Sequence, residues 1–116
     1  MPPTITVVIR DDPRTSHRPV EGLRIALGLS TGSNPLTVIL LDEAIRLLAP
    51  EDERDEIVDD DILEKHLPAL KELGLPFVVR EGATSPASVD EGFPVREVPP
   101  AHIASLISES DRVLVF

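Results

Sequence analysis

The loop of residues 11–18 holds several kinds of side chain that could bind a small ligand. Two carboxylates, two guanidinium groups, an imidazole and two hydroxyls come from Asp11, Asp12, Arg14, Thr15, Ser16, His17 and Arg18. Pro19 fits the first turn of a helix, so the loop should end at a helix N-terminus. Because a helix N-terminus favours negative charge, the pattern is compatible with binding of an anion.

Two interpretations of this loop stay open. In a parallel sheet, ligands bind beyond the carboxyl ends of the strands, near the point where strand order reverses. A binding pocket at that place would use Asp11, Arg14, Ser16, His17, Arg18, Arg80 and Glu81. The other interpretation is an exposed polar loop with a proline turn and a helix cap, because polar residues are expected in loops.

The sequence offers little for catalysis or metal binding. It has no cysteine, no Gly-rich phosphate loop, no GxSxG elbow and no HExxH motif. The three histidines lie on different predicted elements and lack the spacing of metal ligands. An enzyme working through Asp11, Asp12 and His17 is an alternative without a recognisable catalytic arrangement. We therefore predict no catalytic residue, no metal site and no cofactor.

The composition narrows the possible partners. The 116 residues include 11 basic and 21 acidic side chains, for a formal net charge of −10, and residues 51–61 alone hold eight acids against one arginine. Nucleic-acid binding needs cations and stacking surfaces, whereas this chain is acidic and has three phenylalanines as its only aromatic residues. No apolar run reaches the ~20 residues of a membrane span. We expect a soluble, cytoplasmic protein without nucleic-acid or membrane partners, in which residues 51–61 form a solvated loop.

Short apolar segments alternate with helical patterns along the chain. Strands are expected at 5–9, 36–41, 76–80 and 112–116, with a weaker one at 93–98. Helices are expected at 20–31, at 60–73 and from 99 onward, with a short helical piece at 43–49. Apolar strands that alternate with helices predict a mainly parallel sheet covered on both faces. The sequence thus predicts a single domain, residues 1–116, with a doubly wound, flavodoxin-like α/β fold of about five strands.

Several segments, taken in order, resemble the DsrE/DsrF family, the small subunits of sulfur-relay complexes that include the TusB, TusC and TusD proteins. The segments are ITVVIRDDP, EGLRIALGLST, LTVILLDEAIRLL, LPALKELGLPFVV and SESDRVLVF. The resemblance spans nearly the whole chain and implies the same α/β fold. It also implies assembly with itself or with related DsrE-family subunits, as trimers or hexamers.

The resemblance breaks off at the residue that carries sulfur. Members of the DsrE and TusD type hold the transferred sulfur as a persulfide on a cysteine in the loop after the third or a neighbouring strand. Here that loop begins with Arg80, Glu81, Gly82 and Ala83, and the chain has no cysteine. Because a persulfide requires a thiol, the resemblance implies a non-catalytic partner of the DsrF or TusC type.

The segment AIRLLAP gives a separate indication of assembly. Its predicted helix has about one to two turns, which is too small to bury Ile45, Leu47 and Leu48 internally. Apolar side chains left exposed on a small domain often mark an interface. We therefore predict an interface at these three residues, the alternative being that they fold back onto the sheet.

Overall fold

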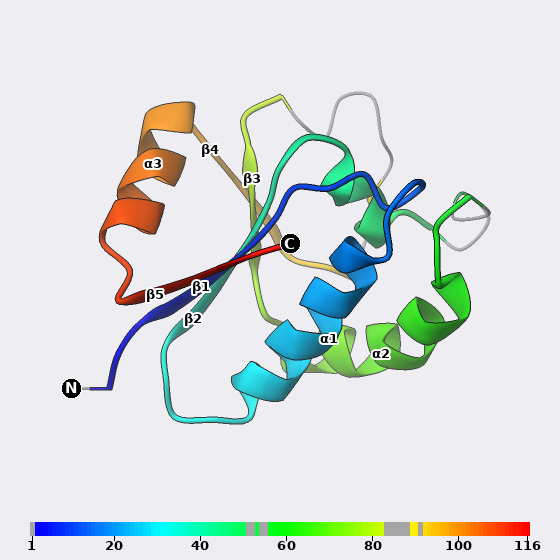
Figure 1. Cartoon of the computed structure of the whole chain (residues 1–116), viewed down its shortest axis with the longest axis horizontal. Helices are drawn as coiled ribbons and strands as arrows, with labels where there is room; N and C mark the ends of the chain where they lie inside the picture. Colours follow the sequence, from blue (N-terminus) through cyan, green and yellow to red (C-terminus); the bar gives the residue numbers. More distant parts are fainter. Residues whose placement is uncertain (1, 51–52, 54–55, 83–88, 91) are drawn as a thin grey trace.

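The computed structural model describes residues 2–50, 53, 56–82, 89–90 and 92–116. In chain order, Figure 1 shows β1 (Ile5–Ile9), α1 (Arg18–Ser30), β2 (Leu36–Leu40), the 3-10 helix η1 (Asp42–Leu48), α2 (Asp60–Leu73), β3 (Phe77–Arg80), β4 (Val95–Val98), α3 (Pro100–Ser108) and β5 (Arg112–Val115). Every strand falls within its predicted range. The first helix begins two residues earlier than predicted, at Arg18, so the polar loop is shorter than the sequence pattern indicates.

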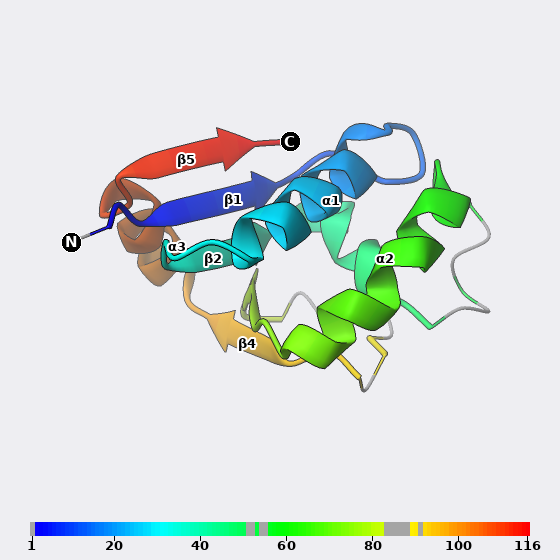
Figure 2. The ribbon, with the colours of Figure 1, turned by 90° about the horizontal axis from the view of Figure 1, so that it is seen from below.

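The strands form one five-stranded sheet in the order β4-β3-β2-β1-β5, and all of its pairings are parallel. From β1 the chain moves outward through β2 and β3 to β4, and then returns across the sheet to place β5 on the other side of β1. The order of strands therefore reverses at β1, which pairs with β5 from Ile5↔Arg112 to Val8↔Val115. Figure 2 shows β4 and β5 as the two outer strands.

Helices cover both faces of the sheet. On one face, α1, α2 and η1 enclose the larger core, which includes Val7 and Phe77. On the other face, Ile103 of α3 packs in a smaller core with Val8 and Val78. Figure 1 shows the sheet running between α3 and the pair α1 and α2. The predicted flavodoxin-like α/β fold with a parallel sheet is confirmed.

The apolar side chains of η1 are buried in the chain's own core. Ile45 is 3% exposed, and Leu47 and Leu48 are fully buried. A 3-10 helix has three residues per turn and aligns residues i and i+3. Ala44 therefore stacks with Leu47, and Ile45 with Leu48, in two adjacent rows that both face the core. The expectation that this segment is too short to bury its apolar side chains is wrong, and the interface predicted there loses its basis.

The helix α1 approaches the sheet closely at Gly22. A Cβ atom at this position would lie 3.0 Å from Cγ of Phe116 and 3.1 Å from Cδ1 of Ile9. The missing side chain at Gly22 thus leaves room for the Phe116 ring against the helix. The other glycine of this helix, Gly28, has no such close neighbour, since nothing lies within 4 Å of its Cβ position.

The outer strand β5 is exposed along its whole length. Val113, Leu114 and Val115 keep 37%, 39% and 46% of their surface accessible. Inner strands such as β1 have the same apolar character but are buried, because neighbouring strands and helices cover them. The exposed apolar surface predicted at η1 is therefore found at β5.

Candidate functional site

The polar loop after β1 lies at the carboxyl edge of the sheet, beside the point where strand order reverses. Its first residues are bonded to the end of β5, because the N–H groups of Arg10 and Asp11 donate to the carbonyl of Phe116 at 2.7 and 3.3 Å. Open parallel sheets bind ligands at such a switch point. The loop therefore lies where a ligand would bind in a sheet of this topology.

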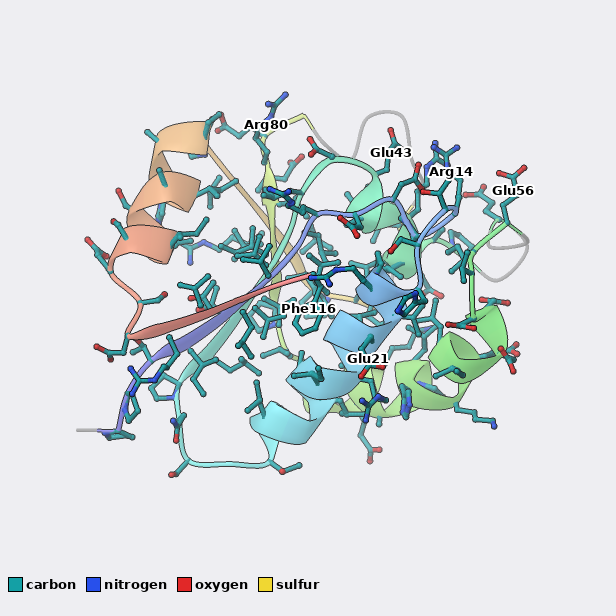
Figure 3. All side chains as sticks on the ribbon, in the orientation of Figure 1. Arg14, Glu21, Glu43, Glu56, Arg80 and Phe116 are labelled. Carbon is teal, nitrogen blue, oxygen red and sulfur yellow. The ribbon has the colours of Figure 1, made fainter. Side chains whose placement is uncertain are left out.

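Carboxylates hold Arg14 on more than one side. Its Nε and Nη2 atoms donate to the two carboxylate oxygens of Asp12 at 3.0 and 2.8 Å, in a bidentate pair. Glu43 of η1 places Oε2 at 3.7 Å from Nη2, and Figure 3 shows Glu56 nearby. The side-chain hydrogen bond with Arg14 lowers the pKa of Asp12, and the same bond raises the pKa of Arg14.

Arg14 therefore serves as a cross-link within the protein. Through Glu43 it connects the loop to η1, and the neighbouring backbone connects the loop to the segment before α2, because Val58 N donates to Pro13 O at 2.8 Å. A guanidinium that already has a bidentate carboxylate partner has fewer donors left for an anion. The contacts of Arg14 therefore suit a role in stabilising the loop better than a role in binding a ligand.

Arg18 connects the loop to β5. Its Nη2 atom donates to the carbonyl of Val115 at 2.8 Å, and its guanidinium lies over the Phe116 ring, 5.9 Å from the centroid. Its Nε atom is 3.6 Å from Oδ2 of Asp11. The same oxygen accepts from the hydroxyl of Ser16 at 3.2 Å, and that hydroxyl accepts from the backbone N–H of Arg18 at 3.1 Å. Asp11, Ser16 and Arg18 thus form one closed group.

The other predicted site residues stand apart from this group. His17 is the exposed N-cap residue of α1 and makes no capping hydrogen bond through its side chain. Arg80 and Glu81 are exposed at the end of β3, and β2 lies between β3 and β1 in the sheet. Two strand spacings amount to about 10 Å, and Figure 3 shows Arg80 well separated from Arg14. The structure therefore brings together only part of the predicted pocket.

Sequence reasoning misses three partners of the loop arginines: Glu43, Val115 and Phe116. Residues that follow the neighbouring strands lie at the same edge as the loop after β1, because the carboxyl ends of parallel strands share one edge. This shared edge could have indicated Glu43 as a member of the site, because Glu43 follows β2. Val115 and Phe116 require knowledge that β5 pairs with β1, and the sequence pattern does not give the order of strands.

An open groove lies away from this loop, between the C-terminal halves of α1 and α2. It has a volume of about 430 Å³ and is lined by Leu27, Thr31, Ala69, Glu72 and Leu73. Its lining is mainly apolar, with one carboxylate and one hydroxyl among the side chains. The groove could accommodate an apolar group, but it contains no pairing of acid, base or nucleophile.

The candidate site is a loop whose charged side chains are bonded to one another and to the neighbouring η1. Its two arginines are matched by Asp11, Asp12 and Glu43. Among the residues that the structure describes, no group of three or more acidic or histidine side chains is placed to hold a metal ion. Within the same part of the chain, no helix has the length and apolarity that crossing a bilayer requires.

The parallel sheet with helices on both faces and a switch point at β1 defines a flavodoxin-like α/β protein. Among solved structures the chain is similar to the ychN protein from E. coli, with a TM-score of 0.73, 20% sequence identity and full coverage of both chains. That protein has a DsrE-like fold. At this identity the likeness establishes the fold. Neither a scan against protein-family models nor a search of the curated proteins finds a match.

Proposed function

We propose that this chain is a non-catalytic subunit of an oligomeric complex of the DsrE/DsrF/TusC type, associated with sulfur transfer in the cytoplasm. The observation that carries the proposal is the lack of any cysteine in a chain whose full length shares the fold of ychN. A persulfide requires a thiolate, so this chain contributes a binding surface to the complex and does not itself carry sulfur. Its partners are further copies of itself or related subunits that carry the cysteine.

The residues after β3 support this role. In the family that the sequence resembles, the sulfur-carrying cysteine lies in this region, whereas Arg80 and Glu81 occupy it here and are exposed. The segment stays bonded to β4 for one residue beyond β3, because Glu81 N donates to Val98 O at 2.9 Å. This edge of the sheet thus presents a pair of opposite charges to the solvent in place of a thiol.

The exposed apolar strand β5 supports the assembly part of the proposal. A small domain with three adjacent apolar side chains left more than a third accessible has a surface suited to association. The predicted interface at η1 is not needed for this argument, because that segment is buried.

Native mass spectrometry of the protein, purified gently from its own host, tests the proposal. We expect a trimer, a hexamer or a complex with a cysteine-bearing relative. The second measurement is persulfide transfer by that relative, followed by alkylation and mass spectrometry, with and without this chain. Purification as a 12.6 kDa monomer with no partner, and no effect on transfer, would rule out the role.

The position of the loop at the switch point favours a second candidate function, a module that binds a small molecule or an anion. Thermal-shift measurements with phosphate, sulfate, thiosulfate and nucleotides test it. A ligand at 100 times its Kd should stabilise the chain by about 2.7 kcal/mol. Arg18→Ala should abolish the shift, whereas Arg24→Ala, on the exposed side of α1, should retain it. No shift with any of these compounds would leave the loop with a structural role alone.

A further inference from the structure

We infer that β5 is a pairing edge through which two copies of this chain join their sheets in antiparallel fashion about a two-fold axis at Leu114. The inference deepens the proposed function, on which it rests for the expectation of assembly, by naming the surface and the register. Figure 2 shows β5 as the outermost strand on its side of the sheet, with β1 as its neighbour on the inner side.

The backbone of β5 alternates between its two sides. Arg112 N donates to Thr4 O at 3.0 Å and Phe116 N donates to Val8 O at 2.8 Å, so these residues bond toward β1. Alternate residues of a strand in a parallel pair bond to the same neighbour. Val113 and Val115 therefore direct their N–H and C=O groups toward the open edge. Such a row of groups is a template for another strand.

The sequence of β5 reads the same in both directions around Leu114, as Val-Leu-Val. In an antiparallel pair centred on this residue, Val113 lies opposite Val115 of the second copy, and the two leucines lie opposite each other. The valines are the residues whose backbone groups face outward, so each valine pair would exchange both of its hydrogen bonds. The backbone geometry and the side-chain sequence thus select the same register.

Pairing with a second copy would bury apolar side chains on both faces of β5. The register with β1 places Leu114 beside Val7, on the face of α1, and places Val115 beside Val8, on the face of α3. Val113 lies on the same face as Val115, because side chains alternate along a strand. These side chains are 37–46% exposed in the single chain, and cross-strand pairs of β-branched residues stabilise antiparallel sheets.

The charge distribution favours a second copy at this edge. The chain carries a net charge of −10, yet the segment from Arg112 to Phe116 contains no acidic residue. Two acidic molecules therefore meet there with little direct repulsion. In the proposed register Arg112 faces Phe116 of the second copy. The one charged residue of the strand, Arg112, lies at its first position, and Val113–Val115 lack the proline and the charges that commonly protect a sheet edge from pairing.

Arg18 is compatible with this pairing. It donates to Val115 O at the open edge, but a carbonyl oxygen has two lone pairs and can accept a second hydrogen bond. A two-fold contact of this kind is closed after two copies. It therefore gives a dimer by itself, or it supplies the two-fold axis that joins two trimers into a hexamer.

Sedimentation equilibrium of the full chain over a range of concentrations tests the contact. We expect association that dissociates on dilution, because a four-residue edge is a small interface. Val113→Pro removes an outward N–H that β1 does not use, and proline is tolerated at such a position. This variant and Val113→Lys should each raise the Kd of association at least about tenfold. Ile62→Lys is the matched control, since Ile62 is also 37% exposed but lies on α2, and it should associate as the wild type does.

Disulfide trapping tests the register itself, and the absence of native cysteines makes its result unambiguous. Directly opposed residues of a non-hydrogen-bonded antiparallel pair lie about 4.5 Å apart at Cα, within the range of a disulfide. Leu114→Cys should therefore form a covalent dimer under mild oxidation, much faster than Leu73→Cys on α2. Far-UV circular dichroism checks that each variant is folded.

The outcomes separate this inference from the proposed function. If both Val113 variants associate as strongly as the wild type, and Leu114→Cys forms a covalent dimer no faster than Leu73→Cys, the β5 contact is overturned. A subunit role is still possible in that case. A dimer that depends on Val113 and is trapped at Leu114 supports the contact even when the chain has no effect on persulfide transfer by a cysteine-bearing relative, a result that would contradict the proposed function alone. A monomeric wild-type chain at all concentrations overturns the β5 contact.

Discussion

The segments η1 and β5 are both short and apolar, but they differ completely in burial. Ile45, Leu47 and Leu48 of η1 are almost entirely inaccessible, whereas the three apolar residues of β5 are 37–46% exposed. In η1 the turn geometry directs two rows of side chains to the same core. In β5 the side chains alternate between two faces, and neither face is fully covered at the end of the sheet.

The difference shows that the fate of a short apolar segment depends on its neighbours in space. The segment η1 lies over the carboxyl end of the sheet and under further chain, since Asp90 N donates to Leu48 O at 2.8 Å. The strand β5 has β1 on one side and the edge of the sheet on the other. Length and apolarity alone would assign both segments the same environment.

Truncation of a buried side chain of η1 should have the largest effect. Leu47→Ala should lower the free energy of unfolding by about 2–5 kcal/mol, because a fully buried leucine leaves a cavity. The same truncation at the exposed Leu114 should cost less than about 1 kcal/mol. Urea unfolding followed by far-UV circular dichroism measures both values, since the chain has no tryptophan or tyrosine. Equal losses at the two positions would abolish the distinction between the segments.

The residue after β5 should give an intermediate effect. The Phe116 ring packs against the larger core, close to Gly22, and lies under the Arg18 guanidinium. Because the ring is half-buried, Phe116→Ala should cost about 1–3 kcal/mol, less than the truncation of a fully buried phenylalanine. Urea unfolding at low protein concentration measures this value. A cost below that of Leu114→Ala would mean that the end of the chain contributes no more than the strand before it.

A polar replacement within β5 should have a smaller effect on the folded monomer. Val113→Thr keeps the β-branched shape and adds a hydroxyl on an exposed position, so the free energy of unfolding should change by no more than about 0.5 kcal/mol. The same substitution at Val79, which is fully buried in β3, is the matched control and should cost more. A large loss at Val113 in dilute solution would show that β5 is covered within the single chain.

These results separate what local sequence determines from what the sheet order determines. The apolar periods of β1, β2 and α2 predict those elements, because each period reports on a local surface. The closed group of Asp11, Ser16 and Arg18 is also local to one loop. By contrast, the separation of Arg80 from the loop depends on β2 lying between β3 and β1. The contacts of Arg18 with Val115 and Phe116 likewise arise from a pairing between the two ends of the chain.

The smallest expected effect concerns Arg14, which ties the loop to the η1 side as Arg18 ties it to the β5 side. The pKa of Asp12 is lowered in the folded chain, mainly by its hydrogen bond with Arg14. The contribution of the pair to stability is therefore complete above the unfolded pKa of about 3.9, and it is lost as the pH falls through the lower, folded value.

Arg14→Gln should consequently lower the urea midpoint at pH 6 by less than Leu47→Ala does, and the difference from the wild type should shrink as the pH falls below the unfolded pKa of the carboxyl. Asp12→Asn is the matched variant, and combining the two substitutions should cost less than the sum of the single changes, because both remove the same pair. Equilibrium unfolding in urea at several pH values measures these differences. A cost of Arg14→Gln that stays constant from pH 2 to pH 7 would mean that Arg14 stabilises the loop through the packing of its aliphatic stem, with no contribution from its charge.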